Sequence, residues 1–429
     1  MIKYLGSKRT LLPTLVALLG EFPELSSVSD VFSGTSRVGH AFKGAGWRVE
    51  ANDHNAYAHC LATCYVQADR DRWHDDAAKL VEEFNRLPGE PGYFTETFCE
   101  RSRFFQPHNG ARVDAIREAI AAKDLPPELH AVLLISLMEA ADRVDSTCGL
   151  QMAYVKKWAK RAYNDLQLRV PDMQPAVTHG PCRAHRSEAL DFAKTVRTHV
   201  AYVDPPYNQH SYLSNYHIWE SLVLWDKPEV YGIACKRVDC RERKSDFNSK
   251  PRHADAFAQV MQQLQAPFLV VSFNNEGYQS REQLEATLSA LGDVFVIAKD
   301  FKRYVGAQIG IYNPSGTKVG DISHLRNEEY IYLVARPGLS DLVPDALDRL
   351  GRFAARVDDP GVASGDDRVS RVEAVLRDVG PQTLAGLRRE TGLSDYQARM
   401  ALESLVGRGV VESVPGRSKR YQVVASSPV

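Results

Sequence analysis

The sequence predicts an α/β protein with a large N-terminal domain and a small C-terminal one. Over the first two thirds of the 429 residues, short strand-like apolar runs alternate with helical stretches, a pattern typical of α/β domains. A chain of this length exceeds the usual size of one domain. A segment rich in Pro, Gly, Asp and Ser follows Arg336, which favours a domain boundary there.

Six strand-like runs are expected in the first domain, at 27–32, 47–51, 200–203, 268–273, 294–297 and 330–334. A helix is predicted over 37–44, between the first two runs. The pattern from 56 to 176 is helical and too long for a simple crossover between strands. It therefore predicts a helical insertion within a domain spanning 1–336.

The C-terminal part predicts a winged helix-turn-helix domain at 368–429, after a linker at 337–367 with a short helix near 345–355. Helices are expected at 368–377, 383–391 and 395–407, and a hairpin from 409–414 and 419–424. Lys and Arg exceed Asp and Glu by four over 368–420, which favours DNA contact, with protein contact or dimerisation as alternatives. The candidate contacts are Arg388, Arg389, Arg399, Arg417, Lys419 and Arg420.

Composition restricts the class of protein. The net charge is −1, so nucleic-acid binding must depend on local basic patches. The seven cysteines are scattered without a Cys-x-x-Cys pair, which favours reduced thiols over a disulfide framework or a zinc site. No apolar stretch is long enough to cross a bilayer, and the first residues lack a signal-peptide core. A cytoplasmic protein with no membrane partner is expected.

The tetrapeptide Asp204-Pro205-Pro206-Tyr207 follows the strand-like run 200–203. An exocyclic amine such as adenine N6 is a poor nucleophile, because its lone pair is delocalised into the ring. Hydrogen bonds from that amine to the Asp204 carboxylate and the Pro205 carbonyl would favour attack on a methyl donor. The two prolines stiffen the loop, and Tyr207 offers a face for a base taken out of the duplex. The alternative is a rigid turn at a strand end.

A turn of small residues, 30–39, lies between the first strand and the first helix. Such a turn lets a cofactor approach the backbone, which makes Phe32 and Gly34 candidate cofactor residues. Asp53 follows the second strand, nineteen residues after Gly34, near the interval at which an acid binds ribose hydroxyls. The turn lacks the G-x-G-x-x-G pattern of dinucleotide sites. A nucleoside cofactor without pyrophosphate, S-adenosylmethionine, fits better.

The opening run Lys3-Tyr4-Leu5-Gly6-Ser7-Lys8 would on its own read as a disordered basic terminus. With the glycine turn and the Asp-Pro-Pro-Tyr motif in this order, residues 1–336 resemble the D12 class of adenine-specific DNA methyltransferases. The resemblance implies a Rossmann-like methyltransferase sheet whose insertion, 56–176, recognises the target. It also implies methyl transfer from S-adenosylmethionine to adenine N6 in a specific double-stranded DNA sequence, with base flipping.

By the same resemblance, Tyr4, Lys8, Asp53 and Asp204 contact the cofactor. The segment 187–192 resembles the loop that holds the cofactor adenine, with Glu188 as candidate and a solvated turn acid as alternative. The run 204–217 is similar to that of methyltransferases that accompany type II restriction enzymes, so a companion endonuclease is an expected partner. Family members usually have glycine where Ser36 stands here.

A basic loop at 235–253 carries a net charge of +4 and is the predicted phosphate clamp. Its basic residues are Lys236, Arg237, Arg241, Arg243, Lys244, Lys250 and Arg252. A second cluster comprises Lys156, Lys157, Lys160 and Arg161. Either cluster could instead be a solvated face. His108, His210 and His217 read as surface histidines.

Within the same chemistry, the alternative substrates are cytosine N4, RNA adenine and a protein glutamine amide. A DNA-binding regulator with a vestigial methyltransferase fold is the alternative from another class. Intact Asp204, Tyr207, Asp53 and Lys8 favour an enzyme. No metal is expected, because direct displacement at a sulfonium needs orientation and charge complementarity. Neither the recognition sequence nor the oligomeric state follows from these motifs.

Overall fold

The computed structural model describes residues 1–6, 8–274, 277–302, 311–312, 318–320, 326–347, 349–350, 365–391, 401–402, 405–406, 410–414 and 420–423. The chain forms two compact units. One contains Met1–Leu12 and Phe22–Val343, and the other contains Pro13–Glu21 and Pro344–Val429.

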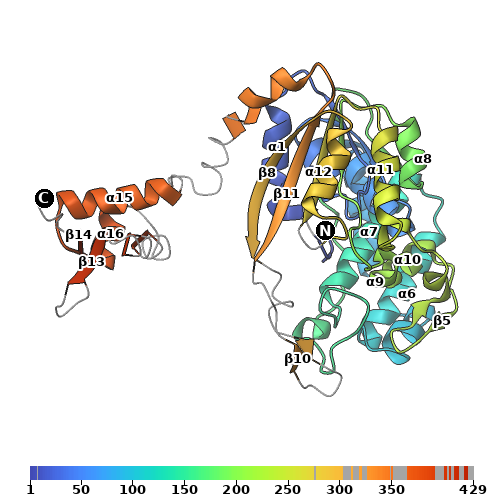
Figure 1. Ribbon diagram of the computed structural model, residues 1–429. Coiled ribbons are helices and arrows are strands. Elements are labelled where there is room, and N and C mark those ends of the chain that lie inside the picture. The colour runs from blue at the N-terminus through green and yellow to red at the C-terminus, as the bar shows by residue number, and fades with distance from the viewer. Residues whose placement is uncertain are drawn as a thin grey trace, which may run out of the picture. The chain divides into compact units, whose positions relative to one another are not determined.

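The larger unit is built on a seven-stranded sheet with the order β3-β2-β1-β4-β7-β11-β8 (Figure 1). Strand β11 is antiparallel to β7 and β8, and the other neighbouring pairs are parallel. The mixed α/β fold with a mostly parallel sheet is therefore confirmed. The strands are β1 (Ser27–Asp30), β2 (Arg48–Asn52), β3 (Arg183–His185), β4 (Val200–Val203), β7 (Phe268–Asn274), β8 (Asp293–Lys302) and β11 (Arg326–Ala335).

Strands β1, β4 and β7 are buried along their whole length, which explains the nearly continuous apolar runs of β4 and β7. From β1 the chain continues to β2 and β3 on one side, whereas β4 and β7 lie on the other. The strand order thus reverses between β1 and β4. In open α/β sheets, ligands bind at the carboxyl ends of the strands beside such a reversal.

Helices cover both faces of the sheet. Helices α8 (Ala189–Thr195), α11 (His253–Gln263) and α12 (Arg281–Ser289) pack on one face through a shared apolar cluster with β4 and β7. Helix α2 (Arg37–Gly44) lies on the opposite face, where Phe42 contacts Tyr202 of β4. Figure 1 shows α11 and α12 in front of the sheet.

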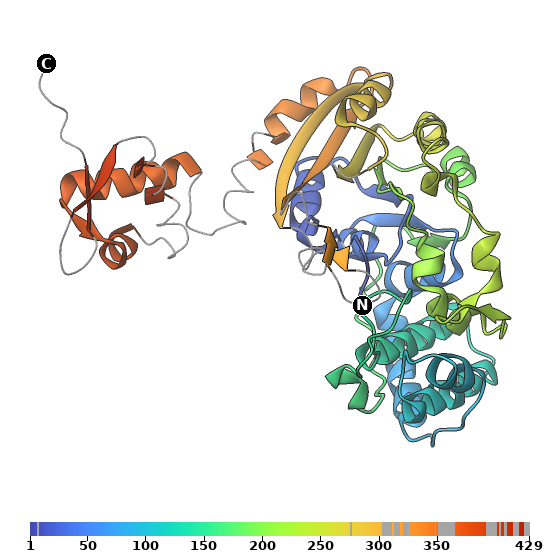
Figure 2. The same cartoon turned by 60° about the horizontal axis from the view of Figure 1, so that its bottom comes forward.

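The insertion after β2 gathers at one end of the larger unit (Figure 2). Its core is α7 (Pro127–Arg143), most of whose residues are buried. Around it lie α3 (Ala56–Ala62), the π-helix η2 (Thr63–Gln67), α4 (Arg70–Asn85), α5 (Tyr93–Thr95), the π-helix η3 (Glu96–Glu100) and α6 (Pro107–Ala121). Helices α9 (Tyr212–Asn215) and α10 (His217–Leu224) follow β4, and residues of α10 share the insertion's apolar cluster.

The helical pattern expected for 56–176 holds to Arg143 and is wrong beyond it. From 144 to 176 the only regular helix is the short 3-10 helix η4 (Lys160–Tyr163). Gly149 adopts a positive φ of 92°, and Pro171 and Pro175 cannot donate backbone hydrogen bonds. The three-residue strand β3 was not predicted, because it is too short for a recognisable pattern.

Smaller elements complete this unit. They are η1 (Lys8–Thr10), the hairpin β5 (Val230–Tyr231) and β6 (Lys236–Arg237), the 3-10 helices η5 (Val238–Arg241), η6 (Asp246–Asn248) and η7 (Ser340–Leu342), and the hairpin β9 (Ile311–Tyr312) and β10 (Lys318–Gly320). Helix α1 (Leu12–Gly20) precedes β1 in the chain, and all of it except Leu12 belongs to the smaller unit.

Part of the segment predicted to be a linker is helical, at 343–347 and 349–350. Val343, Ala346 and Leu350 are buried, and Arg349 forms an ion pair with Glu21. Apolar residues at this spacing lie on one helical face. The short helix predicted near 345–355 is thus present over its described residues, although its start lies two residues earlier.

In the smaller unit, α15 (Gly365–Asp378) and α16 (Leu384–Thr391) pack with a three-stranded sheet. Strands β12 (Gln382–Thr383), β14 (Arg420–Val423) and β13 (Val411–Val414) are antiparallel in that order. Two predicted helices and the hairpin pairing are thus present. The turn at 392–394 and most of the helix expected at 395–407 lie outside the described residues, so the winged helix-turn-helix remains a prediction.

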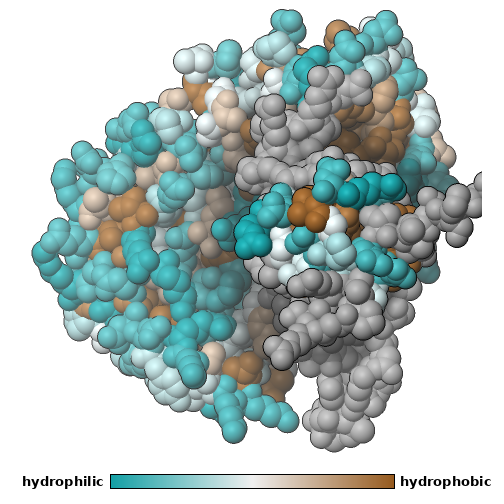
Figure 3. Space-filling view, turned by 90° about the vertical axis from the view of Figure 1, so that its left-hand side faces the viewer, coloured by the Kyte–Doolittle hydropathy of each residue, from teal (hydrophilic) through white to brown (hydrophobic). Residues whose placement is uncertain are grey.

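Hydrophilic side chains cover much of the face drawn in Figure 3, and apolar residues show there as separate patches. Within the described ranges, no helix combines the length and the apolar character that crossing a membrane requires.

Candidate active site

A cleft opens at the carboxyl ends of β1, β2 and β4, beside the reversal of strand order. It encloses about 1020 Å³ of empty space, including the part open to solvent. Seven of the residues predicted from sequence to bind a cofactor or a base line it: Tyr4, Lys8, Phe32, Gly34, Asp53, Glu188 and Asp204. Pro206 also lines the cleft.

The turn after β1 brings its backbone against Asp53. Gly34 has a positive φ of 50°, and its N–H donates to Asp53 Oδ2 over 3.1 Å. The other carboxylate oxygen, Oδ1, accepts from the N–H of Asn55 over 2.9 Å. A Cβ at position 34 would lie 3.3 Å from the Tyr4 hydroxyl, so a glycine fits here both by φ and by space. Burial raises the pKa of Asp53.

Ser36, where the resemblance leads us to expect glycine, also has left-handed backbone (φ 58°, ψ 20°). Its side chain makes no capping hydrogen bond to α2. Left-handed backbone costs a non-glycine residue roughly 1 kcal/mol or more. Ser36→Gly should therefore melt at or above the wild-type temperature, whereas Ser36→Val should lose roughly 1–3 kcal/mol of unfolding free energy.

Denaturant unfolding of both variants checks this expectation, with Ser36→Ala as the control for loss of the hydroxyl. A valine variant as stable as the glycine variant would contradict the assigned backbone strain.

The first residues are anchored over the cleft. The Tyr4 ring stacks between Tyr212 and Tyr216, with centroid distances of 5.1 Å and 4.5 Å. Its hydroxyl lies 3.1 Å from that of Tyr57, and the Leu5 N–H donates to the Tyr216 hydroxyl over 2.6 Å. The interpretation of this run as a disordered tail is therefore wrong for its described residues.

Lys8 places a buried ammonium on the Asp204 carboxylate. Its Nζ lies 3.2 Å from Asp204 Oδ1 and 3.6 Å from Glu329 Oε2, and the lysine is only 5% exposed. Burial raises the pKa of Asp204, and the Lys8 charge opposes that rise. Glu329 was not predicted, because only the pairing of Glu329 on β11 with Asn274 on β7 brings it to this edge.

Asp30, the last residue of β1, is a second buried carboxyl in the cleft and was not singled out from the sequence. It is 1% exposed, and among the described residues its Oδ2 has no hydrogen-bond partner. Burial, with a further contribution from the charge of Asp204, raises its pKa from 3.8 to about 8. At neutral pH Asp30 is thus mostly uncharged.

This shift predicts a pH-dependent effect of Asp30→Asn. An aspartate with a raised pKa in the folded state takes up a proton on folding, so stability falls as pH rises from 3.8 to about 8. Asparagine has no such loss. The melting temperature of the variant relative to wild type should therefore increase between about pH 5 and about pH 8, as differential scanning fluorimetry can measure. A difference that stays constant with pH would contradict a protonated Asp30.

The Asp-Pro-Pro-Tyr loop begins directly after β4. The Tyr207 hydroxyl accepts from Asn274 Nδ2 over 3.0 Å, and its ring lies 5.4 Å from that of Phe273. Lys8 Nζ is 5.9 Å from the centre of the same ring. Tyr207 is half-buried, so part of the ring stays accessible beside Asp204.

At the far end of the cleft, Glu188 Oε1 lies 3.2 Å from His54 Nδ1, although the Glu188 side chain is 72% exposed. Burial lowers the pKa of His54, but the hydrogen bond and charge of Glu188 and the charge of Asp53 outweigh burial and raise it. The Phe32 ring meets Phe247 edge-on at 4.9 Å. This end thus combines an exposed carboxylate with aromatic side chains.

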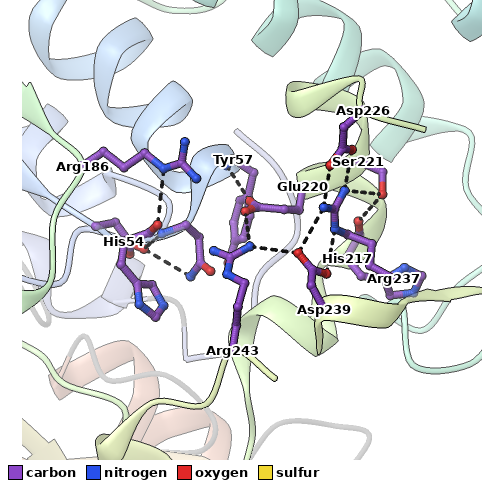
Figure 4. A network of polar contacts seen from close by, with 12 residues as sticks. His54, Tyr57, Arg186, His217, Glu220, Ser221, Asp226, Arg237, Asp239 and Arg243 are labelled. Carbon is purple, nitrogen blue, oxygen red and sulfur yellow. Dashed lines mark hydrogen bonds and ion pairs between the residues drawn. The ribbon is translucent and has the colours of Figure 1, made fainter. Parts of the chain in front are cut away.

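The basic loop departs from its predicted role at two positions. Arg237 is 4% exposed and holds Asp226 through two hydrogen bonds of 2.7 Å and 2.8 Å. Arg243 binds the fully buried Glu220 at 2.9 Å and also lines the cleft. Figure 4 shows Arg243 between Glu220 and Asp239. The burial and ion pairs of Arg237 contradict the prediction that it contacts a DNA phosphate. The ion pairs of Arg243 argue against the same contact by that arginine.

The side chains of the remaining predicted DNA contacts differ in their exposure to solvent. Arg241 and Lys244 are exposed and Lys236 is half-buried; Arg241 lies over the Tyr231 ring at 3.8 Å. In the second cluster, Lys156, Lys157 and Lys160 are exposed, whereas Arg161 binds Asp145 at 2.7 Å. In the smaller unit, Arg389 is exposed; the side chains of Arg388 and Arg420, and all of Arg399, Arg417 and Lys419, lie outside the described residues.

The surface prediction for the three histidines is right for His108 and His210, which are exposed, and wrong for His217. His217 is fully buried, and its Nε2 donates to the Gln151 carbonyl over 3.0 Å. Burial lowers its pKa to about 3. All seven cysteines are free thiols, and only Cys148 is exposed.

Comparison with known proteins identifies a family whose model spans the residues of this cleft. The model of the D12 class N6 adenine-specific DNA methyltransferase family matches residues 4–272. The chain belongs to this family. The match runs from the first motif through the glycine turn, Asp53 and the Asp-Pro-Pro-Tyr loop to β7, and so includes the residues that line the cleft.

Three curated relatives are similar over about 300 residues. Type II methyltransferase M.FokI of Planomicrobium okeanokoites is 29% identical over 68% of this chain, and modification methylase StsI of Streptococcus sanguinis is 27% identical over 66%. The matches cover 47% and 45% of those proteins, so the chain spans slightly under half their length. Type II methyltransferase M.NlaIII of Neisseria lactamica is 26% identical over 71% of this chain and 88% of its own.

Proposed function

We propose that this methyltransferase transfers a methyl group from S-adenosylmethionine to adenine N6 in a specific sequence of double-stranded DNA. One observation carries the proposal: Asp204 and the Pro-Pro turn lie at the edge of a cleft formed by the glycine turn and Asp53. A methyl donor bound in the cleft and a base bound at the loop would then meet at Asp204.

The cleft residues fit such a cofactor. Asp53 offers a carboxylate for ribose hydroxyls at the end of β2, and the close backbone approach at Gly34 makes room for the methionine part. Phe32, Tyr4 and Glu188 would complete the site, with Glu188 at the adenine. S-adenosylmethionine supplies a methyl group that is electrophilic because it is bound to a sulfonium.

The loop residues would act on the base. Asp204 and the Pro205 carbonyl accept hydrogen bonds from the exocyclic amine, while the Tyr207 ring stacks on the flipped base. Burial raises the pKa of Asp204, and the Lys8 ammonium 3.2 Å away opposes that rise, which favours the ionised carboxylate that can accept. Attack of N6 on the methyl carbon would break the bond from that carbon to sulfur, leave a neutral thioether and make the nitrogen positively charged. Asp204, which already accepts from the amine, would be placed to receive the proton that the nitrogen then loses.

The alternatives differ in substrate, and one assay separates them. The purified full chain is incubated with labelled S-adenosylmethionine and unmethylated DNA, total RNA or a protein extract. The proposal predicts label in DNA, and nucleoside analysis should find it in adenine rather than in cytosine N4. Cofactor binding without methylation of any substrate would favour a DNA-binding regulator with a vestigial fold.

Because the relatives are named type II methyltransferases or modification methylases, we further propose a restriction-modification role in the cytoplasm with a companion endonuclease. Base-resolved sequencing of DNA from cells that express the chain gives the modified sequence. If an endonuclease accompanies it, that nuclease should cut the same sequence and be blocked by the methyl group.

We propose that the smaller unit adds DNA contacts, Arg389 among the described candidates. A chain that ends after Leu350 keeps the buried helical segment, which a cut at Arg336 would remove. It should still methylate DNA, but bind it more weakly and with a shallower salt dependence, because the slope falls by about one for each phosphate that the shorter chain no longer binds. Binding with unchanged affinity and slope would identify the unit as a protein-contact module.

A further inference from the structure

The Asp-Pro-Pro-Tyr loop is held by donors from outside it. Three successive carbonyls each accept a hydrogen bond from another part of the chain. These are His253 Nε2 to Pro206 (3.1 Å), the Tyr278 N–H to Tyr207 (2.9 Å) and Asn248 Nδ2 to Asn208 (2.8 Å). The Tyr278 hydroxyl in turn donates to the Asn248 carbonyl over 3.3 Å, which links two of the donors.

The preceding carbonyl, that of Pro205, is not taken by any of these donors. Both prolines have fixed φ angles, so the direction of the Pro205 carbonyl depends on the few remaining backbone torsions. The hydrogen bond to Pro206 fixes the next peptide plane, from which the Tyr207 ring projects. One contact thus orients both the carbonyl and the ring that the proposed function assigns to the base.

His253 is the least expected of the three donors. It is the first residue of α11, is fully buried and is surrounded by the rings of Phe247, Phe257, Phe273 and Tyr278 at 5.8–6.4 Å. Among the described residues its Nδ1 has no partner. A leucine or phenylalanine would fill such surroundings without burying an unpaired nitrogen. The one hydrogen bond that histidine adds goes to Pro206.

We propose that His253 is a positioning residue for methyl transfer. Its Nε2–H holds the Pro206 carbonyl and thereby orients Tyr207 and the Pro205 carbonyl toward the target base. The proposal rests on the proposed function of this loop. A loop displaced by less than an ångström would still bind cofactor in the cleft but would present the amine in the wrong geometry, so the catalytic rate should fall rather than cofactor affinity.

The test compares His253→Leu, which fills the aromatic surroundings without a donor, with His253→Gln, whose amide N–H reaches a similar distance from the backbone. In single-turnover reactions with excess enzyme on unmethylated DNA, the leucine variant should be slower by about tenfold or more. Its cofactor Kd should stay within about twofold of wild type, and the glutamine variant should recover most of the rate. Phe257→Leu, one turn further along α11, is the matched packing control.

A leucine variant as fast as wild type, or a glutamine variant as slow as the leucine variant, overturns the proposal. So does an equal loss of rate in Phe257→Leu at equal melting temperature.

Hydrogen exchange of peptides covering 204–212 gives a readout that needs no methyl transfer. Exchange should rise in the leucine variant and return toward wild type in the glutamine variant. If the wild-type chain methylates no DNA, the proposed function fails, and exchange alone decides the role of His253: a rise confined to this loop supports it, and unchanged exchange overturns it.

Discussion

Replacing Asp204 with alanine or asparagine should lower methyl transfer by at least about a hundredfold, the scale expected for loss of one preorganised electrostatic group. Alanine removes an acceptor for the target amine. Asparagine keeps the shape of the side chain but removes its charge. Both changes leave Lys8 beside Glu329, 3.6 Å away, so the buried ammonium keeps an ion-pair partner. Melting temperatures close to wild type are therefore expected.

The measurement is a single-turnover rate together with a thermal melt and a cofactor titration. Asp75→Ala is the matched control, because that carboxylate is 93% exposed and does not line the cleft. Substantial residual methylation by a folded Asp204→Ala protein would rule out the assigned role of the carboxylate. A loss of rate that follows a loss of folding would instead assign Asp204 to stability.

Asp53→Ala should mainly weaken cofactor binding. A charged acceptor that binds ribose hydroxyls contributes about 1.5–3 kcal/mol, or roughly ten- to a hundredfold in Kd. The same carboxylate also accepts from the N–H groups of Gly34 and Asn55, so its loss loosens the glycine turn as well. Titration calorimetry with S-adenosylmethionine measures the effect.

Asp53→Asn separates the two contributions, since its amide oxygen can still accept from one backbone N–H while the charge is gone. It should bind cofactor with intermediate affinity. If both variants bind S-adenosylmethionine as wild type does, Asp53 lies outside the cofactor site.

The cleft could be predicted from the sequence because its main residues follow strands. Gly34, Asp53 and Asp204 come after β1, β2 and β4, and the carboxyl ends of parallel strands meet at one edge. A glycine or acidic residue shortly after a predicted strand was therefore enough to predict that it lies at this edge of the sheet. The position of Tyr4 in the cleft could be predicted only from the family resemblance, since its stacking partners Tyr212 and Tyr216 lie more than two hundred residues away in the sequence.

Residues whose role depends on tertiary pairing were missed or misinterpreted. Glu329 reaches Lys8 because β11 runs antiparallel beside β7, which no local pattern indicated. Arg237 and Arg243 counted toward a basic loop, but Asp226 and Glu220 neutralise them inside the protein. A count of charges in a segment cannot show which of them are paired from outside it.

Individual buried side chains were also missed, because their surroundings depend on packing. His253 and Asp30 are polar residues in otherwise ordinary segments, and their position against the loop and the cleft follows only from packing. The short helix predicted near 345–355 is present at 343–347 and 349–350, but the burial of Val343, Ala346 and Leu350 could not be predicted from three apolar residues among glycines and prolines.

The most direct test of the central claim is nucleoside mass spectrometry of unmethylated DNA after incubation with the purified full chain and methyl-labelled S-adenosylmethionine. Labelled N6-methyladenine formed by the wild-type chain, and absent with Asp204→Ala at equal melting temperature, is the predicted result. Label in N4-methylcytosine, or no label in DNA from a folded, cofactor-binding chain, would contradict the proposed reaction.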